Sequence, residues 1–128
     1  MCSIFEDGVY PFSGNEARGP NMVNVGLPAR SGSALFRAAV TEQWLPALKA
    51  FKPQMMFISA GFDGHRADDM GNLGLVEADY AWVTGRIVDV ARRHAGGRIV
   101  SCLEGGYDLL SLARSVAAHV KALIEADA

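Results

Sequence analysis

The chain has 128 residues, of which 50% are hydrophobic and 20% charged, and its formal net charge is −2 at pH 7. This length suits one domain or part of one, and the composition is too apolar for a disordered chain. Its lysines and arginines form no basic cluster, so no nucleic-acid binding is expected. No apolar run approaches the ~20 residues of a membrane span, and two cysteines form no disulfide framework. These features predict a soluble protein of the reducing cytoplasm.

The N-terminal region is expected to contain two short strands joined by an aromatic loop. Cys2-Ser-Ile-Phe5 has the composition of a strand end, and Met22-Val-Asn-Val25 that of a second strand. Between them, Tyr10-Pro-Phe-Ser-Gly14 carries the proline and glycine typical of a loop. From the residues alone, the aromatic side chains of this loop could equally anchor it to the core or line a site.

Residues 34–51 have the apolar spacing of a helix, and Ser31-Gly-Ser33 supplies an N-cap signal before it. Pro46 interrupts this helix, because a proline lacks the backbone N–H and clashes with the preceding turn. The sequence therefore predicts either a kink or a second short helix with Pro46 in its first turn.

The stretch that follows is the most informative part of the chain. Met55 to Ile58 is a short apolar run that suits a strand buried on both faces, and small residues lead from it to Asp63 and His65. In parallel α/β sheets, ligands bind outside the carboxyl ends of the strands. Asp63 is thus a candidate site residue, and the alternative is a plain polar loop in which it caps a neighbouring group. Asp68, farther along this loop, is expected to be solvated or a capping group.

A second stretch repeats the pattern. Arg98 to Leu103 is again a short apolar strand, in which Cys102 is expected to be buried, and Glu104-Gly-Gly-Tyr107 follows. The two glycines let the backbone approach a ligand closely, and the Tyr107 hydroxyl can reach the same crevice as Asp63. A phosphate cradle is a weaker alternative, because Glu104 and Asp108 would repel an anion.

Two long helices flank this second strand. Residues 75–95 carry a buried stripe, and His94 falls in the last turn of this helix; the stripe consists of Val76, Tyr80, Val83, Ile87 and Ala91. The last helix is expected from about Asp108 to Ala126, with His119 at its surface or boundary; one of its faces carries Leu109, Leu112, Val116, Val120 and Leu123. With right-handed crossovers, strands and helices in this order predict an α/β fold with a parallel sheet.

Ser59-Ala-Gly-Phe-Asp-Gly-His65 and Leu103-Glu-Gly-Gly-Tyr-Asp108 resemble the two C-terminal signatures of the zinc-dependent histone deacetylase and acetylpolyamine amidohydrolase superfamily, nearest to its class II and bacterial branches. With Asn21-Met-Val-Asn-Val-Gly-Leu-Pro28 upstream, the resemblance extends over nearly the whole chain. It implies an arginase/deacetylase-like α/β fold, a three-layer parallel sheet with flanking helices. Residues 1–128 would be the C-terminal portion of one such domain, with about three β–α units.

The resemblance also implies roles for the two strand ends. Asp63 would be a ligand of a catalytic zinc ion, and Tyr107 would be the catalytic hydroxyl that binds the substrate carbonyl and the developing oxyanion. Gly105 and Gly106 would let this tyrosine move and let backbone border the substrate tunnel. The implied substrates are acetyl-lysine, acetylated polyamines and other small acylated amines.

The family resemblance bears on two further positions. Tyr10 or Phe12 would wall the tunnel that admits the acylated side chain. His65 is a weaker candidate for the metal, because Ala-Gly-Phe-Asp before it matches the third-ligand segment rather than an Asp-x-His pair. A solvated histidine, or one behind the ligands, is therefore favoured at position 65.

The family's His-His pair and Asp-x-His pair have no counterpart here, since the chain has three histidines and none precedes position 65. We therefore expect weak zinc binding and little or no deacetylase activity from this polypeptide alone. An open sheet edge is expected to favour aggregation or homo-oligomers. The alternative function is a non-catalytic remnant that acts as a binding or interaction module.

Overall fold

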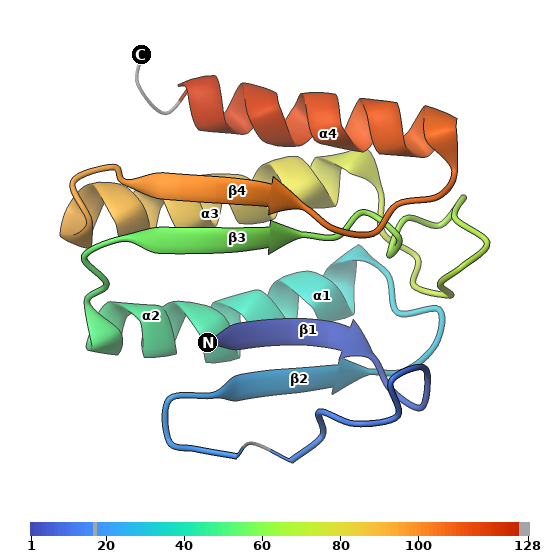
Figure 1. The fold of residues 1–128 in the computed structure, drawn as a ribbon, viewed down its shortest axis with the longest axis horizontal. Helices are drawn as coiled ribbons and strands as arrows, with labels where there is room; N and C mark the ends of the chain where they lie inside the picture. Colours follow the sequence, from blue (N-terminus) through green and yellow to red (C-terminus); the bar gives the residue numbers. More distant parts are fainter. Residues whose placement is uncertain (17, 126–128) are drawn as a thin grey trace.

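The computed structural model describes residues 1–16 and 18–125, and it alternates strands with helices in chain order (Figure 1). The strands are β1 (Cys2–Glu6), β2 (Val23–Leu27), β3 (Met56–Ala60) and β4 (Ile99–Leu103). The helices are α1 (Ser33–Ala39), a π-helical segment η1 (Val40–Trp44), α2 (Leu45–Phe51), α3 (Glu77–His94) and α4 (Leu109–Ile124). Three strand–helix units, preceded by β1, confirm the predicted α/β class with parallel strands.

The four strands form two separate parallel pairs rather than one continuous sheet. β1 pairs with β2, with Ile4 opposite Val25, and β3 pairs with β4, with Ile58 opposite Ser101. All four strands point the same way in Figure 1, so their carboxyl ends lie on one side of the molecule. The sequence did not predict this division, because strand pairing depends on contacts between distant segments.

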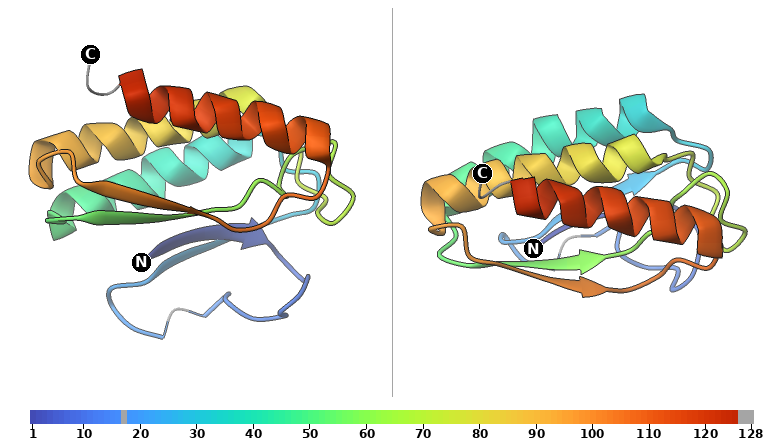
Figure 2. Two further views of the ribbon diagram at one scale, coloured as in Figure 1. Left: turned by 45° about the horizontal axis from the view of Figure 1, so that its top comes forward. Right: turned by 90° about the horizontal axis from the view of Figure 1, so that it is seen from above.

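The helices all lie on one side of the strands in the edge-on view of Figure 2. On β3, Met56 and Ala60 face the helices and are buried, whereas Phe57 between them is exposed. The opposite face of the β3–β4 pair is bare in the described part of the chain. The expectation that Cys102 is buried is wrong, since this cysteine is exposed in β4, whose residues are almost all exposed.

The helix predicted around Pro46 becomes two helices joined by a π-helical segment. α2 begins with Pro46 in its first turn, as one of the two predicted forms requires, and it ends at Lys52 with a left-handed φ of 52°. The N-cap of α1 is Gly32, without a side-chain hydrogen bond, so the predicted serine cap does not form. Instead, the Ser33 hydroxyl donates to Asp79 on α3 at 2.7 Å.

Two apolar clusters hold the helices on the strands. The larger joins both strand pairs through residues such as Val25, Phe36, Phe62 and Tyr80, and the smaller packs Met56 against α3. Most of the predicted α3 stripe is buried or partly buried in these clusters. Within the described residues, no helix is long and apolar enough to cross a membrane.

The face that α4 buries is more polar than expected. Ser111, Ser115 and His119 are its buried residues, whereas Leu109 is exposed, and the predicted surface or boundary position of His119 is wrong. His119 Nδ1 lies 2.7 Å from Thr84 Oγ1, and Nε2 lies 2.9 Å from Ser101 Oγ. Since the Thr84 hydroxyl donates to Tyr80 O, it accepts from Nδ1–H, and Nε2 then accepts from Ser101. Both nitrogens of a neutral imidazole are therefore satisfied.

This buried histidine should make the fold sensitive to mild acid. Burial lowers the pKa of His119 below its ordinary value, so the unfolded chain binds a proton that the folded chain resists. We expect the free energy of unfolding to fall as pH drops below about 6.5, by at most ~1.4 kcal/mol per pH unit from this group. Urea unfolding of wild type and His119→Gln between pH 5 and 7 checks this. Parallel pH profiles for the two proteins would contradict it.

Candidate metal and substrate site

The two signature segments meet where β3 and β4 end. Glu104 N donates to Ala60 O at 2.9 Å, and Phe62 N donates to Gly105 O at 2.7 Å, so the strand pairing continues into both loops. Phe62 points into the core, where its ring lies 5.0 Å from the Tyr80 ring and 5.8 Å from that of His119. This buried anchor fixes the backbone on which the next residue, Asp63, is carried.

The Asp63 carboxylate is packed among glycines. A Cβ added to Gly105 would lie 2.7 Å from Asp63 Cγ, and one on Gly61 would lie 3.2 Å from Asp63 Oδ1. A Cβ on Gly71 would lie 2.5 Å from the Asp63 carbonyl oxygen. The side chain of Asp63 thus lies directly against the backbone of the second signature, which only glycine permits at this distance.

Burial raises the pKa of the Asp63 carboxyl above its ordinary value; its own backbone N–H opposes this rise, and the nearby charge of Asp68 adds to it. The ionised carboxylate is therefore less stable here than in water. A bound cation would relieve this cost.

The turn after Gly105 places Tyr107 at the surface, two residues beyond the glycine that lies against Asp63. Gly106 has φ of +144°, which a side chain rarely adopts, and an added Cβ would lie 2.6 Å from Leu112 Cδ1. The Tyr107 side chain is 56% exposed, so its hydroxyl can meet a ligand from solvent. Helix α4 then begins with Asp108 as its N-cap, accepting from Ser111 N at 2.8 Å.

Asp68 anchors this turn, and two of the three backbone N–H groups that it accepts from lie about forty residues farther along the chain. Its carboxylate accepts hydrogen bonds from Tyr107 N at 2.7 Å, Asp108 N at 3.1 Å and Met70 N at 2.9 Å. Although burial opposes the charged form, these backbone N–H groups lower the pKa of Asp68. Asp68 is only 6% exposed, so the expected solvated position is wrong and the capping role is the observed one.

Replacing Asp68 with alanine should lower the free energy of unfolding by about 2 kcal/mol, because three backbone N–H groups lose a charged acceptor. Asp68→Asn keeps one acceptor oxygen and should cost less. Urea denaturation of both variants measures the difference, with exposed Asp69→Ala as the matched control. Equal stability of Asp68→Ala and Asp69→Ala would show that the turn does not depend on this carboxylate.

His65 is buried rather than solvated, with 2% of its surface exposed. Its Nδ1 accepts from Ala67 N at 3.1 Å, and its Nε2 lies 3.4 Å from Glu77 Oε2. Glu77 also accepts from Arg114 at 2.6 Å, and its own backbone N–H together with this guanidinium lowers the pKa of Glu77 to about 2. Nδ1 is thus engaged by the backbone, whereas Nε2 is buried near the Glu77 carboxylate without a hydrogen-bond partner in the described part of the chain. This burial supports a position behind the site rather than on a metal.

Tyr10 and Phe12 belong to the segment between β1 and β2. Both side chains are largely exposed, and their rings meet edge to face at 6.4 Å. Anchoring this loop to the core is therefore not their role. Phe5 does this instead, since its ring lies beneath Gly14 and Gly26.

The residues present fit one part of a metal site. Asp63 offers a half-buried carboxylate at a strand end, which is a suitable zinc ligand. Among residues 1–16 and 18–125, no group of three His, Cys, Asp or Glu side chains is arranged to hold a metal ion. The described residues therefore support one ligand and not a complete site.

Comparison with known protein families agrees with this geometry. The histone deacetylase domain family matches residues 1–123. The chain belongs to the histone deacetylase family. Its deacetylase relatives include type-2 histone deacetylase 2 of Dictyostelium discoideum, which is 47% identical over 108 residues, covering 82% of this chain and 6% of that protein. The histone deacetylase-like amidohydrolase of Pseudomonas aeruginosa is 36% identical over 113 residues, covering 82% and 30%.

A solved structure gives the same result. The HDA15 HD domain superposes with a TM-score of 0.86 at 30% identity, covering 97% of this chain and 36% of that one. The chain therefore spans about a third or less of the length of these relatives. The predicted α/β deacetylase-like fold, present as part of a domain, is confirmed.

Several buried polar residues near the site escaped sequence reasoning. Glu6, the last residue of β1, is buried and accepts from Asn72 N at 2.8 Å, which ties the loop after β3 to the end of β1. Asp79 is fully buried and links α1 to α3. A carboxylate three residues into a helix is a known capping signal, and Asp79 does accept from Val76 N at 3.1 Å. Its burial depends on α1, which lies more than forty residues earlier.

Proposed function

We propose that this chain is the C-terminal portion of a zinc-dependent deacetylase domain, in which Asp63 is a metal ligand and Tyr107 donates its hydroxyl to the substrate carbonyl. One observation carries this proposal. The Asp63 carboxylate packs against the backbone of Gly105, two residues before Tyr107. The carboxylate and the phenol therefore follow the carboxyl ends of two paired strands, β3 and β4.

Each residue has a defined part in the proposed hydrolysis. When bound, a zinc ion would polarise the acetyl carbonyl and activate water for attack on it. Asp63 would supply negative charge to the metal. Because burial raises the pKa of this carboxyl, its ionised form would gain stability from a bound cation. The exposed Tyr107 hydroxyl would donate a hydrogen bond to the carbonyl oxygen as negative charge develops there. Gly105 and Gly106 allow the close approach and the turn that place it.

The proposed substrates are acetyl-lysine, acetylated polyamines or other small acylated amines. The names of the relatives, histone deacetylases and a deacetylase-like amidohydrolase, support this chemical class without selecting a member of it. Tyr10 and Phe12, exposed after β1, are the proposed aromatic wall beside the acyl group.

On its own, the chain should bind zinc weakly and show no clear turnover. A full ligand set in a structural zinc site gives about 10–16 kcal/mol of apparent binding energy, and one carboxylate supplies a small part of this. Zinc titration by calorimetry, followed by assay of an acetyl-lysine peptide, checks both expectations. Asp63→Asn should abolish the remaining site-specific binding, whereas Asp69→Asn should leave it unchanged. Micromolar or tighter zinc binding with clear turnover would contradict the single-ligand account.

A further inference from the structure

The peptide group between Phe62 and Asp63 is held at its carbonyl oxygen by Tyr80 of α3. The Tyr80 hydroxyl donates to Phe62 O at 3.1 Å, and the side chains of both residues are buried. His65 N donates to the same oxygen at 3.2 Å. Because the turn already supplies one donor to this carbonyl, the hydroxyl adds a tie between α3 and the turn rather than filling an empty acceptor.

The Tyr80 hydroxyl lies against the chain on both sides of Asp63. It is bonded to the residue before Asp63, and a Cβ added to Gly64, the residue after it, would lie 3.4 Å from Tyr80 Oη. The rotamers open to a side chain depend on its backbone φ and ψ. By restraining the backbone at Asp63, Tyr80 therefore restrains the direction in which the carboxylate points.

Phe62 also supports the second signature. A Cβ added to Gly106 would lie 3.2 Å from Phe62 Cβ, and Phe62 N donates to Gly105 O at 2.7 Å. The Tyr80 ring packs on the Phe62 ring, with their centroids 5.0 Å apart. Phe62 thus touches both signature segments, and Tyr80 contacts it at both its ring and its carbonyl oxygen.

Tyr80 is also linked to α4. The Thr84 hydroxyl donates to Tyr80 O at 2.6 Å and lies 2.7 Å from His119 Nδ1 of α4. The His119 ring meets the Phe62 ring edge to face at 5.8 Å. Burial raises the pKa of Tyr80 above its ordinary value, and the nearby charge of Asp63 adds to this rise. The Tyr80 hydroxyl therefore stays protonated and remains a donor.

We propose that Tyr80 is a positioning residue for the candidate metal ligand: its hydroxyl, bonded to Phe62 O, fixes the turn that carries Asp63 and keeps the carboxylate against Gly105. This role rests on the proposed function, in which Asp63 binds the metal. Tyr80 acts through Phe62 and the turn, since its side chain is buried behind them.

Tyr80→Phe tests the proposal, because it removes the hydroxyl and keeps the ring against Phe62. One hydrogen bond of typical strength changes an equilibrium about fivefold, so we expect the minor conformers of Asp63 to rise about fivefold in population. NMR relaxation dispersion at Asp63 and Gly105 in the full chain measures this rise. The readout depends on neither bound metal nor turnover.

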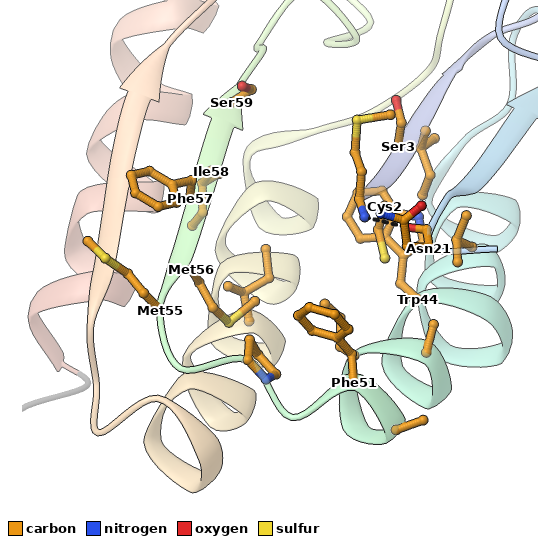
Figure 3. A pocket seen from close by; sticks show the side chains of 18 of the residues that line it. Cys2, Ser3, Asn21, Trp44, Phe51, Met55, Met56, Phe57, Ile58 and Ser59 are labelled. Atoms are coloured by element: carbon orange, nitrogen blue, oxygen red, sulfur yellow. Dashed lines mark hydrogen bonds between the residues drawn. The ribbon is translucent and has the colours of Figure 1, made fainter. Parts of the chain in front are cut away.

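The matched control is Ile87→Val, two turns after Tyr80 on the same helix. Ile87 is buried and lines the apolar groove of about 900 Å³ that Figure 3 shows between β1 and β3. Losing one buried methylene lowers stability by an amount similar to the loss of one hydrogen bond, and it should leave the dispersion at Asp63 unchanged. Equal changes at Asp63 in the two variants, or none in Tyr80→Phe, would overturn the positioning role.

Zinc titration of wild type and Asp63→Asn tests the proposed function separately. Zinc binding that depends on Asp63, together with increased dispersion in Tyr80→Phe, is the expected result. Binding that depends on Asp63 without increased dispersion would overturn the role of Tyr80 and leave the proposed function intact. Increased dispersion with zinc binding that is independent of Asp63 would overturn the proposed metal role and leave Tyr80 as a support of the turn.

Discussion

Replacing Asp79 with alanine should lower the free energy of unfolding by about 3 kcal/mol, the largest single effect on stability that we expect. Its carboxylate is fully buried and accepts from Ser33 Oγ at 2.7 Å, Arg37 Nε at 2.9 Å and Val76 N at 3.1 Å. Removal of the carboxylate would leave the start of α3 without its cap and would break the hydrogen bonds between α1 and α3. Because small domains are marginally stable, much of the variant should be unfolded at room temperature.

Urea unfolding followed by far-UV circular dichroism measures this loss. The matched control is Asp89→Ala on the same helix, whose exposed carboxylate lies 3.2 Å from Arg86. An exposed pair of this kind contributes little, so this change should stay within about 0.5 kcal/mol of wild type. Similar losses for the two variants would mean that Asp79 does not organise the contact between α1 and α3.

Gly105→Ala should disturb the candidate site directly. The new Cβ would lie 2.7 Å from Asp63 Cγ, so either the carboxylate or the turn must move. We expect a loss of about 1–3 kcal/mol in stability from overpacking. In an assembled deacetylase domain, we expect turnover to fall by about 100-fold, since a displacement near 1 Å at a reacting centre can have this effect.

Gly85→Ala is the control for Gly105→Ala, because an added Cβ at this helical position has open space. It should raise the free energy of unfolding by about 0.5–1 kcal/mol through better helix propensity. Thermal melting of both variants, together with NMR shifts of Asp63 and Gly61, gives the comparison. An unchanged Asp63 environment in Gly105→Ala would show that the two signatures are not in contact.

Local chemistry in the sequence predicted much of this fold. Apolar runs of strand length placed β3 and β4, and Pro46 indicated the break before α2. Each of these signals acts within a few residues, because backbone freedom and side-chain spacing are local properties. Asp63 and Tyr107 could be named as candidates because each follows an apolar run of strand length, whereas their proposed roles came from the family resemblance.

The polar interior could not be predicted in this way. Asp68, Asp79 and His119 have charged or polar side chains, which are usually found at the surface. Each is buried here because a segment far away in the sequence packs against it and supplies its hydrogen-bond partners. Asp68 meets Tyr107 across 39 residues, and His119 meets Thr84 across 35. A sequence shows that such a group needs a partner, but it does not show which segment will supply one.

The sequence by itself determined the order of strands and helices, and it supplied Asp63 and Tyr107 as candidate site residues. Only the tertiary structure decided that the strands form two pairs, that Asp63 packs against Gly105, and that an apolar groove separates β1 from β3. The physical reason is that contacts between distant segments decide strand pairing and burial. The free energies of these contacts cannot be read from a local sequence pattern.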